Sequence, residues 1–201
     1  MPRFPQVTGL ILAGGTGRRL GGTEKAFLQL NGQTFISRLV ELFGRFFGQT
    51  LIVTNNPTAY LGLGVRAVRD LEPDRGAIMG LITGLFYAPT EWSFVTACDM
   101  PLLKEEVVAL VVESIKDQVK VVLPQSSDGL QPLAAAYHQD CRHCLNRLLR
   151  QGQFSLRPLF KQVPVQTIGP AQLALVDPWG RSFVNVNTPA DLKAVANEKK
   201  E

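Results

Sequence analysis

The chain has 201 residues, of which 45% are hydrophobic and 19% charged, with a formal net charge of +4 at pH 7. This composition is ordinary for a globular protein of one domain. The Lys and Arg residues are scattered and form no known nucleic-acid-binding motif, so we expect no nucleic acid partner. The first apolar run is only as long as a strand and no run could span a bilayer, which predicts neither a leader nor a membrane anchor. Three cysteines, an odd count, favour the reducing cytoplasm.

Short apolar runs alternate with amphipathic segments along the chain, which is typical of parallel sheets covered by helices. The pattern predicts strands over residues 7–12, 51–54, 65–68, 92–98, 119–123, 133–137, 163–168 and 182–186. It predicts helices over 35–47, 78–87, 105–116 and 140–151, and a last helix with Thr188 as its cap and Pro189 in its first turn. We therefore expect an α/β fold with three αβα layers, a mostly parallel sheet and a single domain over residues 1–201.

A glycine-rich turn follows the first predicted strand. Gly14, Gly15 and Gly17 allow the backbone to approach a ligand closely, and such turns point their amides at anions. Arg19 and Lys25 add positive charge beside the turn. The turn therefore indicates a binding site for a nucleoside triphosphate, and the alternative is a structural turn with solvated arginines.

Two common phosphate-binding motifs do not fit this turn. The P-loop requires a glycine before its lysine and Ser or Thr after it, whereas Lys25 stands between Glu24 and Ala26. The dinucleotide-binding motif requires a small residue where Leu20 stands. The turn is therefore of another kind.

Polar residues follow the other predicted strands. Asn55, Asp70 and Asp99 each come directly or almost directly after an apolar run. The carboxyl ends of parallel strands meet at one edge of a sheet, where ligands bind. A carboxylate beside a triphosphate indicates Mg²⁺, which takes one or two carboxylates together with phosphate oxygens. Asp99 is the expected metal ligand, with a helix cap as its alternative; Asp70 could contact metal, base or ribose, or only cap a loop.

The complete set of motifs resembles the sugar-nucleotide-type nucleotidyltransferases, and more closely their molybdenum cofactor guanylyltransferase branch. The resemblance extends over about residues 7–193. It rests on segments 12–21 with Lys25, 76–80 with Gly84 and Leu85, 98–101, 131–137, and 183–189 with Leu192.

The resemblance implies an enzyme that transfers GMP from Mg·GTP to the terminal phosphate of molybdopterin and releases pyrophosphate. It implies Mg²⁺ as cofactor, a nucleotide-binding part over about 7–123 and an acceptor-binding part over about 124–197. It also implies transient contacts with other proteins of cofactor synthesis and with molybdoenzymes. The residues that it assigns to the nucleotide are Leu12, Ala13, Gly14, Gly15, Gly17, Lys25, Asn55, Asp70 and Asp99.

The resemblance also implies roles for individual side chains. Arg19 and Lys25 would neutralise charge on the phosphates and on the departing pyrophosphate, and Asp99 would hold the metal. Asn185 and Asn187 would lie near the metal or the pterin phosphate, and Gly80 would lie on the acceptor side. The three catalytic residues are thus expected to be Arg19, Lys25 and Asp99.

Two departures bear on specificity. Related cytidylyl- and uridylyltransferases have Ala where this chain has Gly14, so the missing methyl group favours a purine. The family usually has Pro where Ala77 stands, which predicts a less rigid loop here. The alternatives are transfer of another nucleotide, or to another acceptor (cytidylyl transfer to molybdopterin, a cobinamide phosphate, a sugar phosphate), and a nucleotide-binding module without catalysis.

A second cluster invites a zinc interpretation. His138, Cys141, His143 and Cys144 stand close together in sequence, but we expect them at the start of a helix where they do not share one face. A complete set of four ligands is therefore not expected. Cys98 is expected to be a buried small residue rather than a nucleophile.

Overall fold

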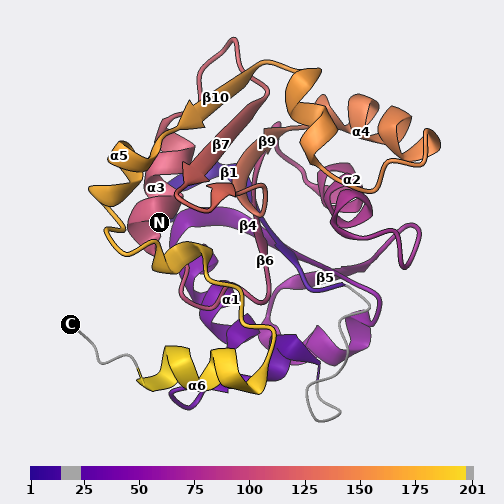
Figure 1. Cartoon of the computed structure of the whole chain (residues 1–201). Coiled ribbons are helices and arrows are strands. Elements are labelled where there is room, and N and C mark those ends of the chain that lie inside the picture. The colour runs from indigo at the N-terminus through magenta and orange to yellow at the C-terminus, as the bar shows by residue number, and fades with distance from the viewer. Residues whose placement is uncertain (15–23, 198–201) are drawn as a thin grey trace.

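The computed structural model describes residues 1–14 and 24–197, and its central feature is an eight-stranded sheet (Figure 1). The strand order is β10 (Val165–Ile168), β7 (Val121–Ser126), β9 (Ala134–His138), β6 (Trp92–Ala97), β1 (Phe4–Leu12), β4 (Phe47–Thr54), β5 (Arg66–Arg69). Strand β9 runs antiparallel to both its neighbours, β6 and β7, whereas the pairs β1–β4, β1–β6, β4–β5 and β7–β10 are parallel. The short β8 (Gly129–Leu130) pairs with β7 outside the main path.

Helices cover both faces of this sheet, which confirms the three-layer α/β fold. Strand β1 shows how the sequence specifies the two faces: Ile11 belongs to one buried cluster, while Leu10 and Leu12 belong to the other. The first cluster is completed by α1 (Phe35–Phe46), α3 (Glu105–Glu113) and α5 (Pro170–Ala174), and the second by α2 (Ala77–Tyr87) and α4 (Cys141–Arg150).

Aromatic side chains join α1 to the sheet. The ring of Phe43 lies edge-on to Phe47 and Phe94, with centroids 5.0 and 5.7 Å away. Gly9 of β1 makes room for them, since a Cβ atom there would lie 2.4 Å from Cδ2 of Phe43. The helix begins where Oγ1 of Thr34 accepts a hydrogen bond from the amide of Ser37. Capping and packing thus fix the helix beside the carboxyl end of β1.

The last helix, α6 (Pro189–Asn197), lies beside a hairpin formed by β2 (Gln29–Leu30) and β3 (Gln33–Thr34) (Figure 1). Asn31 and Gly32 both have positive φ at the turn, the conformation that favours Asn-Gly in two-residue hairpins. Between them Leu30, Phe35 and Val186 form a small core. The predicted cap of α6 is confirmed: Thr188 Oγ1 accepts from the amide of Asp191.

The strand predicted over 182–186 is wrong. The chain forms a 3₁₀ turn, η4 (Arg181–Phe183), and then continues without regular structure. Ser182 and Val186 are buried as a strand would require, but they are buried by contacts with other segments and not by pairing in the sheet. The hairpin, β8, α5 and the 3₁₀ segments η1 (Lys25–Phe27), η2 (Pro57–Leu63) and η3 (Arg157–Lys161) were not predicted.

Candidate functional site

The carboxyl ends of four neighbouring strands form one side of a cavity of about 400 Å³. The residues that directly follow these strands remain hydrogen-bonded to the neighbouring strands, so the strands end side by side. The amide of Ala13 donates to Val53 O (2.8 Å), that of Cys98 to Leu12 O (3.0 Å) and that of Asp70 to Thr54 O (3.0 Å). The predicted edge therefore exists. The residues expected at the site that line this cavity are Leu12, Ala13, Gly14, Lys25, Asn55, Asp70, Gly80, Asp99 and Asn185.

Asp99 follows β6 and faces Lys25 at one end of the cavity. Its Oδ2 lies 3.8 Å from Nζ of Lys25, and this Nζ also donates a hydrogen bond to Oδ1 of Asn187. The alternative of a helix cap is wrong, because α3 begins after Lys104. Burial raises the pKa of the Asp99 carboxyl, and the nearby ammonium group of Lys25 only partly opposes this. The carboxylate is thus positioned to gain from a further cation.

Asp70 follows β5 at the other end of the cavity. Its Oδ1 accepts a hydrogen bond from Oγ1 of Thr83, at 2.7 Å, and the same hydroxyl accepts from the amide of Leu71. Burial raises the pKa of Asp70, and the hydrogen bond from Thr83 opposes the rise. Helix α2 therefore holds the carboxylate in one orientation, with Oδ2 on the side of Gly14.

Asn55 and Asn56 both line the cavity, but their side chains are bound differently. Oδ1 of Asn56 accepts a hydrogen bond from Thr58 at 2.8 Å. Oδ1 of Asn55 is buried and has no hydrogen-bond partner among the described residues. Because an unpaired buried oxygen costs about 1–3 kcal/mol, Asn55 is the better candidate for a ligand contact.

Glycines allow helix α2 to lie close to β1. A Cβ atom on Gly80 would lie 3.4 Å from Cδ1 of Leu12, within the cavity wall. Gly76, with φ of +72°, precedes the helix, and Ala77 occupies its first position, where Pro is readily accommodated. Gly80 therefore lies beside Leu12, an expected nucleotide residue, in the wall of the same cavity.

Glu24 and Tyr60 are among the cavity residues that were not predicted from sequence. Glu24 Oε2 accepts a hydrogen bond from the hydroxyl of Tyr60 at 3.2 Å, and both residues line the cavity. Burial raises the pKa of Tyr60, so its hydroxyl remains a donor. Tyr60 comes from η2, whose short turns carry no periodic signal in the sequence.

A buried polar cluster attaches the segment that carries Asn185 and Asn187. Oδ1 of the buried Asp177 lies 3.1 Å from Nζ of Lys104, and its Oδ2 accepts from the amide of Ser182 at 2.7 Å. Ser182 Oγ accepts in turn from the amide of Lys104. Further along, the amide of Val186 donates to Asp99 O at 2.8 Å, which places both asparagines beside Asp99.

Replacement of Asp177 tests this attachment. Asp177→Ala removes the acceptor of Ser182 and leaves Lys104 without its partner, so we expect a loss of about 2–3 kcal/mol in the free energy of unfolding, measured with urea. The exposed Asp117, which follows α3, provides the control, and Asp117→Ala is expected to change stability by less than about 0.5 kcal/mol. Equal stability of the two variants would contradict the attachment.

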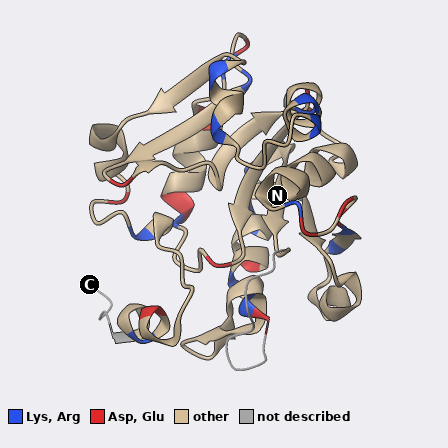
Figure 2. Ribbon diagram, turned by 45° about the vertical axis from the view of Figure 1, so that its right-hand side comes forward, with Lys and Arg blue, Asp and Glu red and all other residues tan. Residues whose placement is uncertain are grey.

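The remaining expected site residues, Gly15, Gly17 and Arg19, lie outside the described residues, as does Arg18. In the part of the chain that is described, the carboxylates of Glu24, Asp70 and Asp99 outnumber the ammonium group of Lys25 in the cavity wall. Figure 2 shows Lys and Arg on several separate elements. Within residues 1–14 and 24–197, no helix combines the length and apolar character required to cross a membrane.

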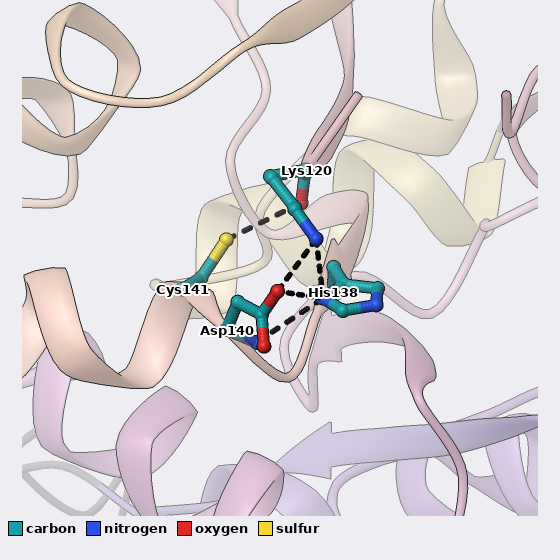
Figure 3. A network of polar contacts seen from close by, with 4 residues as sticks. All are labelled: Lys120, His138, Asp140 and Cys141. Carbon is teal, nitrogen blue, oxygen red and sulfur yellow. Dashed lines mark hydrogen bonds and ion pairs between the residues drawn. The ribbon is translucent and has the colours of Figure 1, made fainter. Parts of the chain in front are cut away.

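The side chains of His138, Cys141 and Cys144 form hydrogen bonds within the protein. His138 ends β9, and α4 begins only at Cys141, so the expected position of all four residues at a helix start is wrong for His138. Nδ1 of His138 lies 3.3 Å from Nζ of Lys120 and accepts from the amide of Asp140, and Lys120 also pairs with the Asp140 carboxylate (Figure 3). Cys141 Sγ donates to the carbonyl oxygen of Lys120, and burial raises the pKa of this thiol to about 12. The thiol is therefore protonated.

Cys98 is similar in this respect. Burial, reinforced by the charge of Asp99, raises the pKa of its thiol to about 12. A thiol with such a pKa is a poor nucleophile at neutral pH.

Comparisons with known proteins agree with this geometry. A family model described as the MobA-like NTP transferase domain matches residues 9–167. This chain belongs to that family. It is therefore a nucleotidyltransferase, and the predicted enzyme class is confirmed.

Individual members of the MobA-like family match over almost their whole length. A protein of Desulfosudis oleivorans named molybdenum cofactor guanylyltransferase is 38% identical over 187 residues, 93% of each chain. A probable molybdenum cofactor guanylyltransferase of Natranaerobius thermophilus is 32% identical over 93% of each chain. The crystal structure of molybdopterin-guanine dinucleotide biosynthesis protein A from Archaeoglobus fulgidus has a TM-score of 0.81 and 29% identity, and covers 94% of this chain and 97% of that chain.

Proposed function

We propose that this enzyme transfers GMP from GTP to the terminal phosphate of molybdopterin. An oxygen of the acceptor phosphate attacks the α-phosphorus, the bond from that phosphorus to the bridging oxygen breaks, and pyrophosphate leaves. The attacking group is already an anion, so the enzyme needs no strong general base. What carries the proposal is one cavity with Asp99 and Lys25 at one end and Asp70 with Asn55 at the other, in a chain of this family.

The charges in the cavity support a divalent cation. A triphosphate would meet the carboxylates of Glu24, Asp70 and Asp99, which repel it unless cations compensate. Asp99 fits Mg²⁺ that arrives with the nucleotide, because this ion uses few protein carboxylates and keeps phosphate oxygens and water as its other ligands. When bound, Mg²⁺ would act as a Lewis acid and a template at the α-phosphate.

The protein groups then mainly position the two substrates and neutralise the charge of the phosphates. Lys25 would exchange its hydrogen bond with Asn187 for phosphate oxygens and stabilise the charge that develops on pyrophosphate. We extend the same role to Arg19, and assign the amides of Gly14, Gly15 and Gly17 to the triphosphate. Asn185 and Asn187, held beside Asp99, would approach the metal or the acceptor phosphate.

The other end of the cavity suits guanine. The Watson–Crick edge of guanine presents two adjacent N–H donors, and Oδ2 of Asp70 is free of the hydrogen bond that Thr83 makes to Oδ1. Asn55 adds a buried carbonyl oxygen that lacks a partner among the described residues. Leu12 and Ala13 would contact the base from β1.

The acceptor would enter from the side of Leu133 and Asn185, with Gly80 in the adjoining wall. This assigns the nucleotide to about residues 7–123 and the acceptor to about 124–197 of one domain. We further propose that the enzyme works in the cytoplasm and contacts other proteins of molybdenum cofactor synthesis, and molybdoenzymes, only transiently.

Incubation of the enzyme with Mg²⁺, molybdopterin and each of the four nucleoside triphosphates tests the proposal. We expect pyrophosphate and a dinucleotide product with GTP, measured by chromatography. Product with CTP but not with GTP would overturn the proposal, as would turnover only with a sugar phosphate as acceptor.

Gly14→Ala tests the assignment of the base end. A Cβ atom at Gly14 would lie 3.8 Å from Oδ2 of Asp70 and from Cα of Thr54, which is ordinary contact, so the folded protein tolerates it. The added methyl group would occupy space beside the guanine edge. We expect an unchanged melting temperature and a KM for GTP raised about tenfold, which corresponds to about 1.4 kcal/mol. An unchanged KM would place the base elsewhere.

A further inference from the structure

A second hollow of about 660 Å³ adjoins the cavity at its Asp70 end. The two share Gly14, Asn55, Asp70 and Gly76 as lining residues, so they meet where the base is proposed to bind. The far wall of the second hollow consists of Pro73, Asp74, Arg75 and Phe154. None of the residues of this far wall has a role in the proposed chemistry.

Arg75 and Phe154 contact each other in this wall. The guanidinium carbon of Arg75 lies 5.7 Å from the ring centroid of Phe154, within cation–π range. Arg75 belongs to the segment between β5 and α2, where Asp74 has φ of +65° and Gly76 has φ of +72°. Phe154 belongs to the segment after α4. The packing of α4 on α2 brings these two segments together.

The side chain of Phe154 is 50% exposed, and it lines the second hollow. The polar groups of Asp70 and Asn55 lie in the same hollow. A planar ligand that carries donors on its edge and an apolar face matches this combination. Aromatic rings and guanidinium planes are the usual stacking partners of nucleic acid bases.

We infer that the Arg75–Phe154 pair is the outer wall of the base subsite, on which the purine ring of the donor nucleotide stacks. This inference rests on the proposed function, because it takes the nucleotide to run from Asp99 to Asp70. The pair would then contribute to nucleotide specificity. A purine covers more of the pair than a pyrimidine does, so the larger contact area favours binding of GTP over CTP.

The same two helices supply a matched control at their other ends. Arg142 of α4 lies 5.5 Å from the ring centroid of Phe86 of α2, and Phe86 is 54% exposed. This second pair has the same chemistry and exposure, but it lines neither of the two hollows.

The experiment measures binding of Mg·GTP, Mg·CTP and Mg·triphosphate by calorimetry to the wild-type protein and to Phe154→Ala, Phe154→Tyr and Phe86→Ala. We expect Phe154→Ala to weaken the binding of GTP about 5- to 150-fold, the range for loss of one stacked base. The affinity for CTP should fall by a smaller factor, and the affinity for inorganic triphosphate should not change. Phe154→Tyr should bind GTP as the wild type does, and so should Phe86→Ala.

The outcomes separate the inference from the proposed function. If wild-type protein binds no Mg·GTP, the proposed function fails. If it binds Mg·GTP and Phe154→Ala binds it equally well, the function stands and the inference is overturned. A Phe154→Ala variant that keeps GTP affinity but raises KM for the acceptor would assign the pair to the pterin ring, which also overturns the inference. Melting curves of all variants, expected to coincide, exclude unfolding as the cause of weak binding.

Discussion

Asp99→Asn is expected to lower kcat for guanylyl transfer about 10³-fold while the protein remains folded. The amide keeps the size of the side chain but loses the charge that would hold Mg²⁺ at the α-phosphate. Metal-ion stabilisation of a phosphoryl transition state is worth several kcal/mol, and each 1.36 kcal/mol corresponds to about tenfold in rate. Single-turnover assays with saturating GTP would measure this loss directly. Turnover within tenfold of wild type would remove Asp99 from the catalytic group.

The same substitution is expected to stabilise the protein in the absence of nucleotide and metal. Burial raises the pKa of Asp99, so the folded protein holds this proton more tightly than the unfolded chain does. As the pH rises above the ordinary value of 3.8, ionisation of the buried carboxyl therefore reduces stability, and the cost grows until the pH has passed the raised pKa. An amide has no such cost.

Thermal unfolding at pH 7 provides the measurement. We expect a higher melting temperature for Asp99→Asn than for wild type without ligands, and a stabilising shift with Mg·GTP that is larger for wild type. Asp117→Asn, on the exposed turn after α3, serves as the control and is expected to leave both quantities unchanged. A less stable Asp99→Asn protein would indicate that the contact with Lys25 outweighs burial.

Asp70→Asn is expected to reduce kcat/KM for GTP about 100-fold and to admit XTP. The carboxylate can accept from both N–H groups on the guanine edge, whereas an amide presents a donor to one of them. A good bidentate contact contributes about 1–3 kcal/mol of discrimination between bases. Xanthine has an acceptor oxygen where guanine has its amino group, so the amide donor restores one contact. Competition assays with GTP and XTP would measure the change; equal losses with both would assign Asp70 to the ribose.

The pH dependence of GTP binding gives a second measurement on Asp70. Burial raises the pKa of this carboxyl above its ordinary value of 3.8. The ionised form is the proposed acceptor for guanine, so GTP affinity should decline on acidification, and it should do so at a higher pH than an exposed carboxyl would produce. The Asn variant cannot titrate and should show a weaker dependence between pH 7 and pH 4. Parallel pH profiles for both proteins would contradict the contact.

The fold could be predicted from sequence where burial has a clear period. Strands such as β1 and β6 are buried on both faces, and α1 has its apolar residues on one side, so the spacing of apolar residues was enough to predict their types. The strand predicted over 182–186 was wrong because the burial of this segment arises from tertiary contacts. Ser182 is buried by its hydrogen bonds with Asp177 and Lys104, and Val186 by Leu30 and Phe35. The local pattern of apolar and polar residues cannot distinguish such a segment, buried by tertiary contacts, from a strand of the sheet.

The candidate site was predictable to the extent that it follows strand ends. Gly14, Asn55, Asp70 and Asp99 were expected at one edge because each follows an apolar run, and the structure brings all four to one cavity. Thr83 could not be found this way, since its hydroxyl meets Asp70 only when α2 packs against the sheet. Nor could Phe154, which reaches the hollow beside Asp70 only through the packing of α4 on α2.

The segment around Asn185 and Asn187 has a consequence for biosynthesis of the protein. Lys25 is made early, yet its hydrogen-bond partner Asn187 is joined to the chain 162 positions later. Chains fold from the N-terminal side as they emerge from the ribosome. The sheet edge with Asp70 and Asp99 can therefore form on the nascent chain, but the pocket is completed only when translation has passed Asn187. A ribosome-stalled fragment that ends before this segment would have the eight-stranded sheet and helices α1 to α5, and yet be inactive.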